Sequence, residues 1–168
     1  MQERRTVSSL TRATARTVVL AIAAAVLVAD RVTTSLALHH LHGVTHVWGP
    51  FGLGLDFNSG FAFSLFSGRA VLVTVLLCIG VAVLAVVVAR SRTRLEAIGG
   101  GLVLGGALGN LSERLISDGH RGQVPDFITL THWPTFNVAD AAVTAGVVII
   151  AVALLVERDS GVVQEPSS

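Results

Sequence analysis

The sequence contains no lysine, a single cysteine and few charged residues. All 12 basic residues are arginines, and charged residues make up only 14% of the chain. The one cysteine, Cys78, excludes a disulfide framework within the chain, and a net charge of +1 implies no nucleic-acid partner. Hydrophobic residues instead make up 52% of the chain. This composition is too apolar for a soluble domain and indicates a small polytopic membrane protein.

Four stretches are apolar enough to be interpreted as membrane-spanning helices, each of which needs about 20 residues. They are approximately residues 17–38, 71–89, 95–111 and 138–156. The predicted fold is therefore an all-α membrane protein with four transmembrane helices in a single domain, residues 17–157. Residues 1–16 would form a cytoplasmic N-terminal segment, and residues 158–168 a disordered cytoplasmic tail.

The arginines predict the orientation of these helices. Four arginines precede the first stretch and three lie between the second and third, whereas three lie in the two remaining connections. Because basic residues are enriched in cytoplasmic connections, both termini are predicted to lie inside. The outer segments would then be residues 39–69 and 112–137.

The two outer segments carry different patterns. Residues Leu53 to Phe66 are rich in glycine and phenylalanine with partly alternating apolar positions, which predicts short strands or a flap at the membrane surface. Residues 126–133 are expected to lie along the membrane surface and to be partly helical. Trp48 and Trp133 are expected to be interfacial anchors.

Glycines on the predicted third helix follow a regular spacing. Gly101, Gly105 and Gly109 are each four residues apart. Small residues at this spacing let membrane helices approach closely. A nucleotide-binding glycine loop is a poor alternative, because no Gly-Lys-Ser/Thr sequence occurs and the glycines lie within a predicted membrane helix.

Polar residues from three of the predicted helices reach a similar depth. With a rise of about 1.5 Å per residue, Asp30, Asn110 and Asp140 lie about 21–26 Å from the inner surface of a core about 30 Å thick. Asn58 and Asp126 lie in the outer segments directly above. A carboxylate at this depth costs roughly a few kcal/mol. Two of them within reach of each other suggest an acid/base pair that activates water near the outer leaflet.

Four motifs occur in order along the chain. They are Asp30-Arg31-Val32-Thr33; Asn58-Ser59-Gly60-Phe61-Ala62-Phe63; Gly105-Gly106-Ala107-Leu108-Gly109-Asn110-Leu111-Ser112-Glu113-Arg114; and Val124-Pro125-Asp126-Phe127-Ile128 with Phe136-Asn137-Val138-Ala139-Asp140. Together they resemble the motifs of the bacterial lipoprotein signal peptidases, also called signal peptidase II. The resemblance covers roughly residues 17–157.

This resemblance implies an aspartyl endopeptidase of the bacterial cytoplasmic membrane, with a small extracytoplasmic β-cradle and a short surface helix. Its substrates would be prolipoproteins, cut just before a cysteine that carries diacylglycerol, and globomycin would inhibit it. No metal or organic cofactor is expected, and the other partners would be membrane lipids around a monomer. Asp126 and Asp140 would be the catalytic residues. The residues expected to bind substrate or orient the site are Asp30, Asn58, Gly60, Asn110, Arg114 and Asn137.

Three substitutions depart from the usual family pattern and leave other functions open. Thr34 stands where the family usually has lysine, Glu113 where it usually has aspartate, and Pro125 where it usually has a small apolar residue. One alternative is therefore a catalytically weak relative that binds prelipoproteins. A proton-coupled transporter would need ionisable residues through the inner halves of the spans. These halves lack them apart from Glu96, which argues for a site on one side of the membrane. A structural or assembly protein would leave the two aspartates unexplained.

Several residue roles also stay open at this stage. Asp30 either contacts the substrate or forms an ion pair with Arg114 that stabilises the fold. Asn110 and Asn137 either orient the aspartates or clamp two helices together. Which aspartate holds the proton cannot be assigned from the sequence, because such a pair titrates jointly.

Histidines crowd the first outer segment, at positions 39, 40, 42 and 46. No matching cysteine or glutamate framework for zinc accompanies them. A solvated loop that becomes positive at acid pH is the simpler interpretation.

Overall fold

The computed structural model describes residues 11–59, 70–91, 93–116 and 122–162. These residues form four helices and one antiparallel sheet of four strands. The helices are α1 (Arg12–His40), α2 (Ala70–Val88), α3 (Arg94–Ile116) and α4 (Val138–Val162). The strands are β1 (Thr45–Trp48), β2 (Phe51–Asn58), β3 (Val124–Leu130) and β4 (Trp133–Phe136), and they lie in this order in the sheet.

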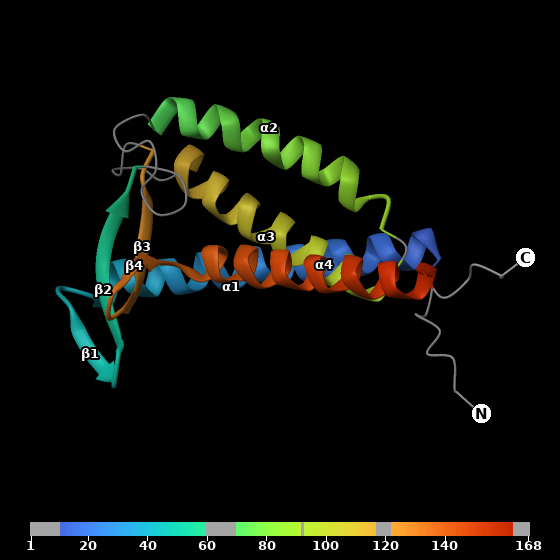
Figure 1. Ribbon diagram of the computed structural model, residues 1–168. Coiled ribbons are helices and arrows are strands. Elements are labelled where there is room, and N and C mark those ends of the chain that lie inside the picture. Colours follow the sequence, from blue (N-terminus) through green and yellow to red (C-terminus); the bar gives the residue numbers. More distant parts are fainter. Residues whose placement is uncertain (1–10, 60–69, 92, 117–121, 163–168) are drawn as a thin grey trace, which may run out of the picture.

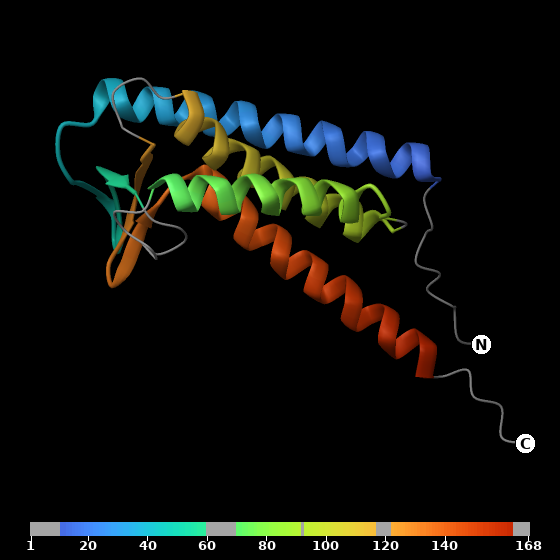
Figure 2. The same cartoon turned by 90° about the horizontal axis from the view of Figure 1, so that it is seen from above.

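The sheet lies across one end of the four helices (Figure 1). The start of α1 and the end of α4 lie at the opposite end, together with the connection between α2 and α3. Seen from above, α1 and α4 are close together beside the sheet and diverge away from it (Figure 2). The described parts of both predicted outer segments are therefore at the same end of the molecule, where α1 and α4 come closest.

Two helices are long and apolar enough to cross a membrane. They are α1 and residues Val138–Val156 of α4, whereas the apolar stretch Thr74–Val86 of α2 is shorter. Only 22% of the most hydrophobic window is buried in each of the two, so neither resembles the core helix of a soluble domain. Of the four predicted spans, these two have both the length and the mean hydropathy of a membrane-spanning helix. In α3, glycines and charged residues near both ends lower the hydropathy.

The helices extend beyond the predicted spans. α1 begins at Arg12, where the Thr11 hydroxyl accepts a hydrogen bond from the Thr14 N–H at 3.2 Å and caps the helix. α4 continues to Val162, so its last turn includes the first residues of the predicted tail. Hydropathy limits the length that can lie in lipid, but a helix can continue through polar residues until its hydrogen bonding ends.

The prediction of partly helical structure at residues 126–133 is wrong. This segment belongs to β3 and the start of β4, and no surface helix occurs between residues 122 and 137. β3 pairs with β2 in an antiparallel register that places Leu53 opposite Ile128 and Asn58 opposite Val124. Valine, phenylalanine, isoleucine and threonine in β3 favour a pleated strand. The strands expected from Leu53 onward are found as far as Asn58, and the remainder to Phe66 is mostly outside the described residues.

α3 contacts all three other helices, and its glycines allow those contacts. Gly105 lies so close to α1 that a Cβ atom there would be 2.8 Å from the Ala23 carbonyl oxygen. Gly106 lies so close to α4 that a Cβ atom would be 2.3 Å from the Ala139 carbonyl oxygen. The predicted close packing at the glycine spacing is thus confirmed, and α3 meets both α1 and α4 at its glycines.

We predict that Gly106→Ala lowers the free energy of unfolding by roughly 1–3 kcal/mol, because the added methyl group must push α3 away from α4. Thermal unfolding of the purified protein in detergent measures this change. Gly80→Ala in α2 is the matched control, because nothing lies within 4 Å of a Cβ atom at that position. Equal unfolding temperatures for the two variants would contradict the close approach of α3 and α4.

Candidate active site

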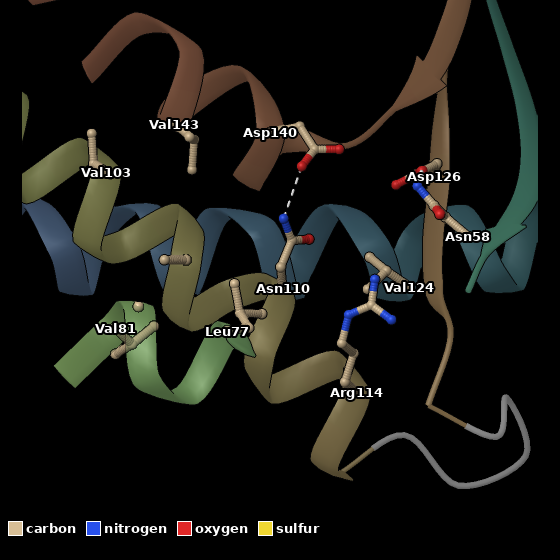
Figure 3. Close-up of a pocket in the computed structure, with 12 residues that line it drawn as sticks. Asn58, Leu77, Val81, Val103, Asn110, Arg114, Val124, Asp126, Asp140 and Val143 are labelled. Carbon is tan, nitrogen blue, oxygen red and sulfur yellow. Dashed lines mark hydrogen bonds between the residues drawn. The ribbon is translucent and has the colours of Figure 1, made fainter. Parts of the chain in front are cut away.

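Asp126 and Asp140 come from different elements and face the same cavity. Asp126 lies on β3 and Asp140 in the first turn of α4. Both line a cavity of about 240 Å³, together with Asn58, Asn110 and Arg114. Figure 3 shows the two carboxylates on opposite sides of this cavity, with their side chains directed toward each other. The other lining residues, including valines of α2, α3, α4 and β3, make the cavity largely apolar.

Asn137 links the two carboxylates, because it caps the helix on which Asp140 lies. Its Oδ1 atom accepts a hydrogen bond from the Asp140 backbone N–H at 2.9 Å. Its Nδ2 atom donates to Asp126 Oδ1 at 2.9 Å and to Asn110 Oδ1 at 3.1 Å. Asn110 Nδ2 in turn donates to Asp140 Oδ1 at 2.8 Å, so that the two amides connect the carboxylates.

Asn58 makes a further contact to Asp126 from the sheet. It ends β2, directly opposite Val124 of β3. From there its Nδ2 atom donates to Asp126 Oδ2 at 3.1 Å. The strand pairing therefore places a second amide donor on Asp126. Asn58, Asn110 and Asn137, all predicted site residues, thus contact the two aspartates directly.

Asp30 stabilises the start of α4 from the neighbouring helix α1. Its side chain is completely buried, with 0% of its surface exposed. Asp30 Oδ1 accepts a hydrogen bond from the Ala139 backbone N–H at 2.9 Å. A Cβ atom at Gly109 would lie 2.8 Å from Asp30 Oδ2, so a larger residue there would have to displace this carboxylate.

These contacts bear on one of the roles that the sequence left open for Asp30. The alternative of an ion pair with Arg114 is wrong, because Asp30 instead bonds to the backbone of α4. The Asp30 carboxylate has no exposed surface in this conformation and contacts the start of α4. Arg114 lines the cavity and donates to the Gly122 carbonyl oxygen at 2.9 Å. Gly60 lies outside the described residues.

The surroundings of Asp126 favour its neutral form. Burial of the side chain, followed by the negative charge of Asp140, raises the pKa of Asp126 to about 7, against the opposing effect of the Asn58 hydrogen bond. More distant charges act in both directions, with Asp56 raising the pKa and Arg114 lowering it. A carboxyl group that exchanges its proton near neutral pH is suited to general acid–base catalysis.

Comparison with known proteins identifies this arrangement. The sequence profile of the family described as "Signal peptidase (SPase) II" matches residues 22–156. The chain belongs to the signal peptidase II family. Among its relatives, the lipoprotein signal peptidase of Rhodococcus jostii is 37% identical over 147 residues, which cover 84% of this chain and 74% of the relative. The lipoprotein signal peptidase of Mycobacterium leprae is also 37% identical, over 79% of this chain and 69% of the relative.

Solved structures agree with this family assignment. One structure described as a bacterial membrane enzyme has a TM-score of 0.76 and 25% identity, over 89% of this chain and 93% of its own. A second, described in the same words, has a TM-score of 0.70 and 26% identity, over 82% and 92% of the two chains. This signal peptidase II is therefore an integral membrane protease. The alternatives of a transporter and of a structural protein are excluded.

One ion pair of this signal peptidase II was not predicted from its sequence. Arg31 of α1, which follows Asp30 in the first motif, donates a hydrogen bond to the buried carboxylate of Glu113 on α3. Thr34, which replaces the usual lysine of the family, is buried one turn further along α1. The cation that meets Glu113 in this chain thus comes from Arg31. The position of Arg31 beside Asp30 was the only sequence feature that pointed to this ion pair, because Arg31 and Glu113 are 82 residues apart.

We predict that Asp30→Ala lowers the free energy of unfolding by about 1–3 kcal/mol, because the buried Ala139 N–H loses its acceptor. Asp30→Asn is the matched control, since its amide oxygen can still accept that hydrogen bond. Thermal unfolding of both variants in the same detergent tests the idea. If the asparagine variant lost as much stability as the alanine variant, the bond to Ala139 would not be the contribution of Asp30.

Proposed function

We propose that this signal peptidase II is an aspartic endopeptidase that removes signal peptides from prolipoproteins. It would cut the peptide bond just before a cysteine that carries diacylglycerol, with Asp126 and Asp140 as the catalytic residues. The observation that carries the proposal is the pair of carboxylates facing one cavity from β3 and α4. Relatives named lipoprotein signal peptidases support the choice of substrate.

The proposed chemistry needs one proton on the pair. Two carboxylates in an apolar cavity do not both ionise readily, so one stays neutral. The ionised member would remove a proton from a water molecule, which attacks the carbonyl carbon of the scissile bond. The neutral member would donate its proton to the carbonyl oxygen as the tetrahedral intermediate forms. These steps use only protein side chains and water, and no metal or organic cofactor enters them.

The remaining site residues would hold this pair and the substrate in place. Asn58, Asn110 and Asn137 would orient the carboxylates through the hydrogen bonds described above. Arg114, whose side chain lines the cavity, would bind a polar group of the substrate backbone. Gly60 is proposed as a substrate contact on its motif alone.

The cavities around Asp140 suit a substrate with apolar parts. A second cavity of about 400 Å³ lies between β4 and α4 and shares Asn58, Asp140 and Val143 with the first. Its walls include Trp133, Phe136 and small residues of α4. Two mainly apolar cavities that meet at one aspartate would accommodate the peptide and the acyl chains of a lipid-modified substrate on different sides.

All four helices are proposed to cross the bacterial cytoplasmic membrane, with both termini in the cytoplasm. The 19 residues of α2 are compatible with this, because a rise of about 1.5 Å per residue nearly matches a core about 30 Å thick. The sheet and the site would then lie near the outer leaflet. We propose residues 17–157 as the peptidase domain, acting as a monomer surrounded by membrane lipids.

We predict that Asp126→Asn and Asp140→Asn each reduce kcat/KM for a diacylglyceryl-modified prolipoprotein peptide by about 10³-fold or more, because each removes one half of the acid–base pair. Cleavage by the purified protein, followed by mass spectrometry, measures the effect, and globomycin should block cleavage. Asp56→Asn is the matched control, because Asp56 faces Asp126 across the strand pair but is exposed.

The control should retain activity within a few-fold of the unaltered protein. Normal cleavage by either aspartate variant would rule out the aspartic mechanism. Binding of the peptide without cleavage by the unaltered protein would instead select the alternative of a catalytically weak relative.

A further inference from the structure

Two consecutive residues of α1 contact the two helices that bring polar side chains to the cavity. Asp30 accepts a hydrogen bond from the Ala139 N–H at the start of α4. Arg31 donates to the buried Glu113 carboxylate near the end of α3. Consecutive side chains of a helix point about 100° apart, so two neighbouring residues can reach different partners. This part of α1 therefore holds α4 with one side chain and α3 with the next.

Each of these contacts is made to the residue just before one that lines the cavity. Ala139 precedes Asp140, and Glu113 precedes Arg114. Arg114 lies in the last turn of α3, where helical hydrogen bonding ends. Its guanidinium donates to the Gly122 carbonyl oxygen, just before β3. The last turn of α3 is thus connected to α1 through Glu113 and to the start of the Asp126 strand through Arg114.

The glycines of α3 give the register of this helix against α1. A Cβ atom at Gly105 would lie 2.8 Å from Val26 Cβ, and one at Gly109 would lie 2.8 Å from Asp30 Oδ2. Four residues of α3 therefore correspond to four residues of α1, and both helices run toward the sheet (Figure 1). One turn further along each helix, position 113 is level with position 34.

Both departures from the family pattern in these two helices consequently occur at one level. Thr34 stands where lysine is usual and Glu113 where aspartate is usual. Thr34 is buried, and within the described residues its hydroxyl oxygen has no hydrogen-bond partner. The cation at this level comes instead from Arg31, three residues earlier on α1. A longer cationic side chain and a longer carboxylate side chain accompany this change of position.

The burial of Glu113 makes its cation important. Only 3% of its surface is exposed, whereas Arg31 reaches it with a side chain that is 37% exposed. A buried carboxylate that loses its partner keeps the cost of leaving water without the attraction that offset it. The last turn of α3 would then shift toward water, and Arg114 would shift with it.

We infer that Arg31 is a positioning residue that holds the last turn of α3, and with it Arg114, at the cavity. It supplies the cation that a lysine at position 34 would bring to the same level, so that Thr34 and Glu113 belong to one coupled exchange. The inference rests on the proposed function, in which Arg114 binds a polar group of the substrate backbone. Asp30 has the corresponding effect on the start of α4.

Steady-state cleavage of a diacylglyceryl-modified prolipoprotein peptide tests the inference. Arg31→Met should raise KM about 10-fold and change kcat by less than about 3-fold, because Arg114 shifts while the two aspartates stay in place. Arg31→Lys should keep KM within about 3-fold of the unaltered protein, because it retains the charge. Arg16→Met is the matched control, since Arg16 is an exposed arginine of the same helix. It should leave both constants unchanged.

Moving the cation to position 34 should restore the site. Arg31→Met/Thr34→Lys should return KM to within about 3-fold of the unaltered value, because the new ammonium group is level with Glu113. Arg31→Met/Val32→Lys should not restore it, because Val32 is 53% exposed. An unchanged KM in Arg31→Met, or equal recovery with either lysine, would overturn the inference. A fall in kcat at an unchanged KM would do the same.

Glu113→Gln keeps the inference testable if Arg31→Met does not fold. It removes the buried charge and keeps the size of the side chain, so that no unpaired carboxylate remains. Its KM should rise about 3-fold, because a neutral acceptor holds Arg31 less strongly than a carboxylate does. A KM equal to that of the unaltered protein would reject the positioning role.

Hydrogen exchange followed by mass spectrometry separates this inference from the proposed function, because it requires no substrate. Arg31→Met should speed amide exchange about 10-fold in the last turn of α3 and leave the start of α4 unchanged. Asp30→Ala should give the reverse pattern. Faster exchange at the end of α3, together with no cleavage by the unaltered protein, would reject only the proposed function. Unchanged exchange there, together with normal cleavage by the unaltered protein, would reject only the role of Arg31.

Discussion

The hydrogen bond from the Asp140 backbone N–H to Asn137 is the contact on which the site depends. It begins α4, and it also directs the Asn137 amide toward the neighbouring strand and toward α3. The capped start of α4 thereby holds two carboxylates in place, one on a helix and the other on a strand. Asp30 supports the same point by binding the adjacent N–H of Ala139, so two consecutive donors of α4 are held by side chains.

This arrangement is possible only because α3 is narrow where the other helices meet it. Gly106 and Gly109 leave room for the backbone of α4 and for the carboxylate of Asp30. In lipid there is little hydrophobic force between helices, so close packing and hydrogen bonds must hold them together. The buried core reflects this requirement, since Ala15, Ala23 and Ala97 are three of the six residues in its main buried cluster. The same glycines that pack the bundle therefore also position the two aspartates of the cavity.

Much of the site could be predicted from sequence, because its residues lie in four ordered motifs and at one estimated depth. The two aspartates and three asparagines were found in this way and are brought together in the structure. The partner of Asp30 could not be predicted, because a backbone N–H leaves no trace in the sequence. The strands at residues 124–136 were mistaken for partly helical structure because their pairing with β2 is a long-range interaction. Helices α1 and α4 were predicted too short, because hydropathy indicates which residues can lie in lipid and not where helical hydrogen bonding ends.

Asn58 lies on the sheet, whereas Asn110 lies in the bundle, and this separation has a pharmacological consequence. A compound that pushes the end of β2 away from β3 would withdraw an amide from Asp126 and weaken its ability to ionise. Such a compound would raise the pKa of Asp126 without filling the space between the aspartates. Drug discovery against this fold therefore has a second point of attack, at the rim of the sheet, where small displacements are converted into a change of acidity.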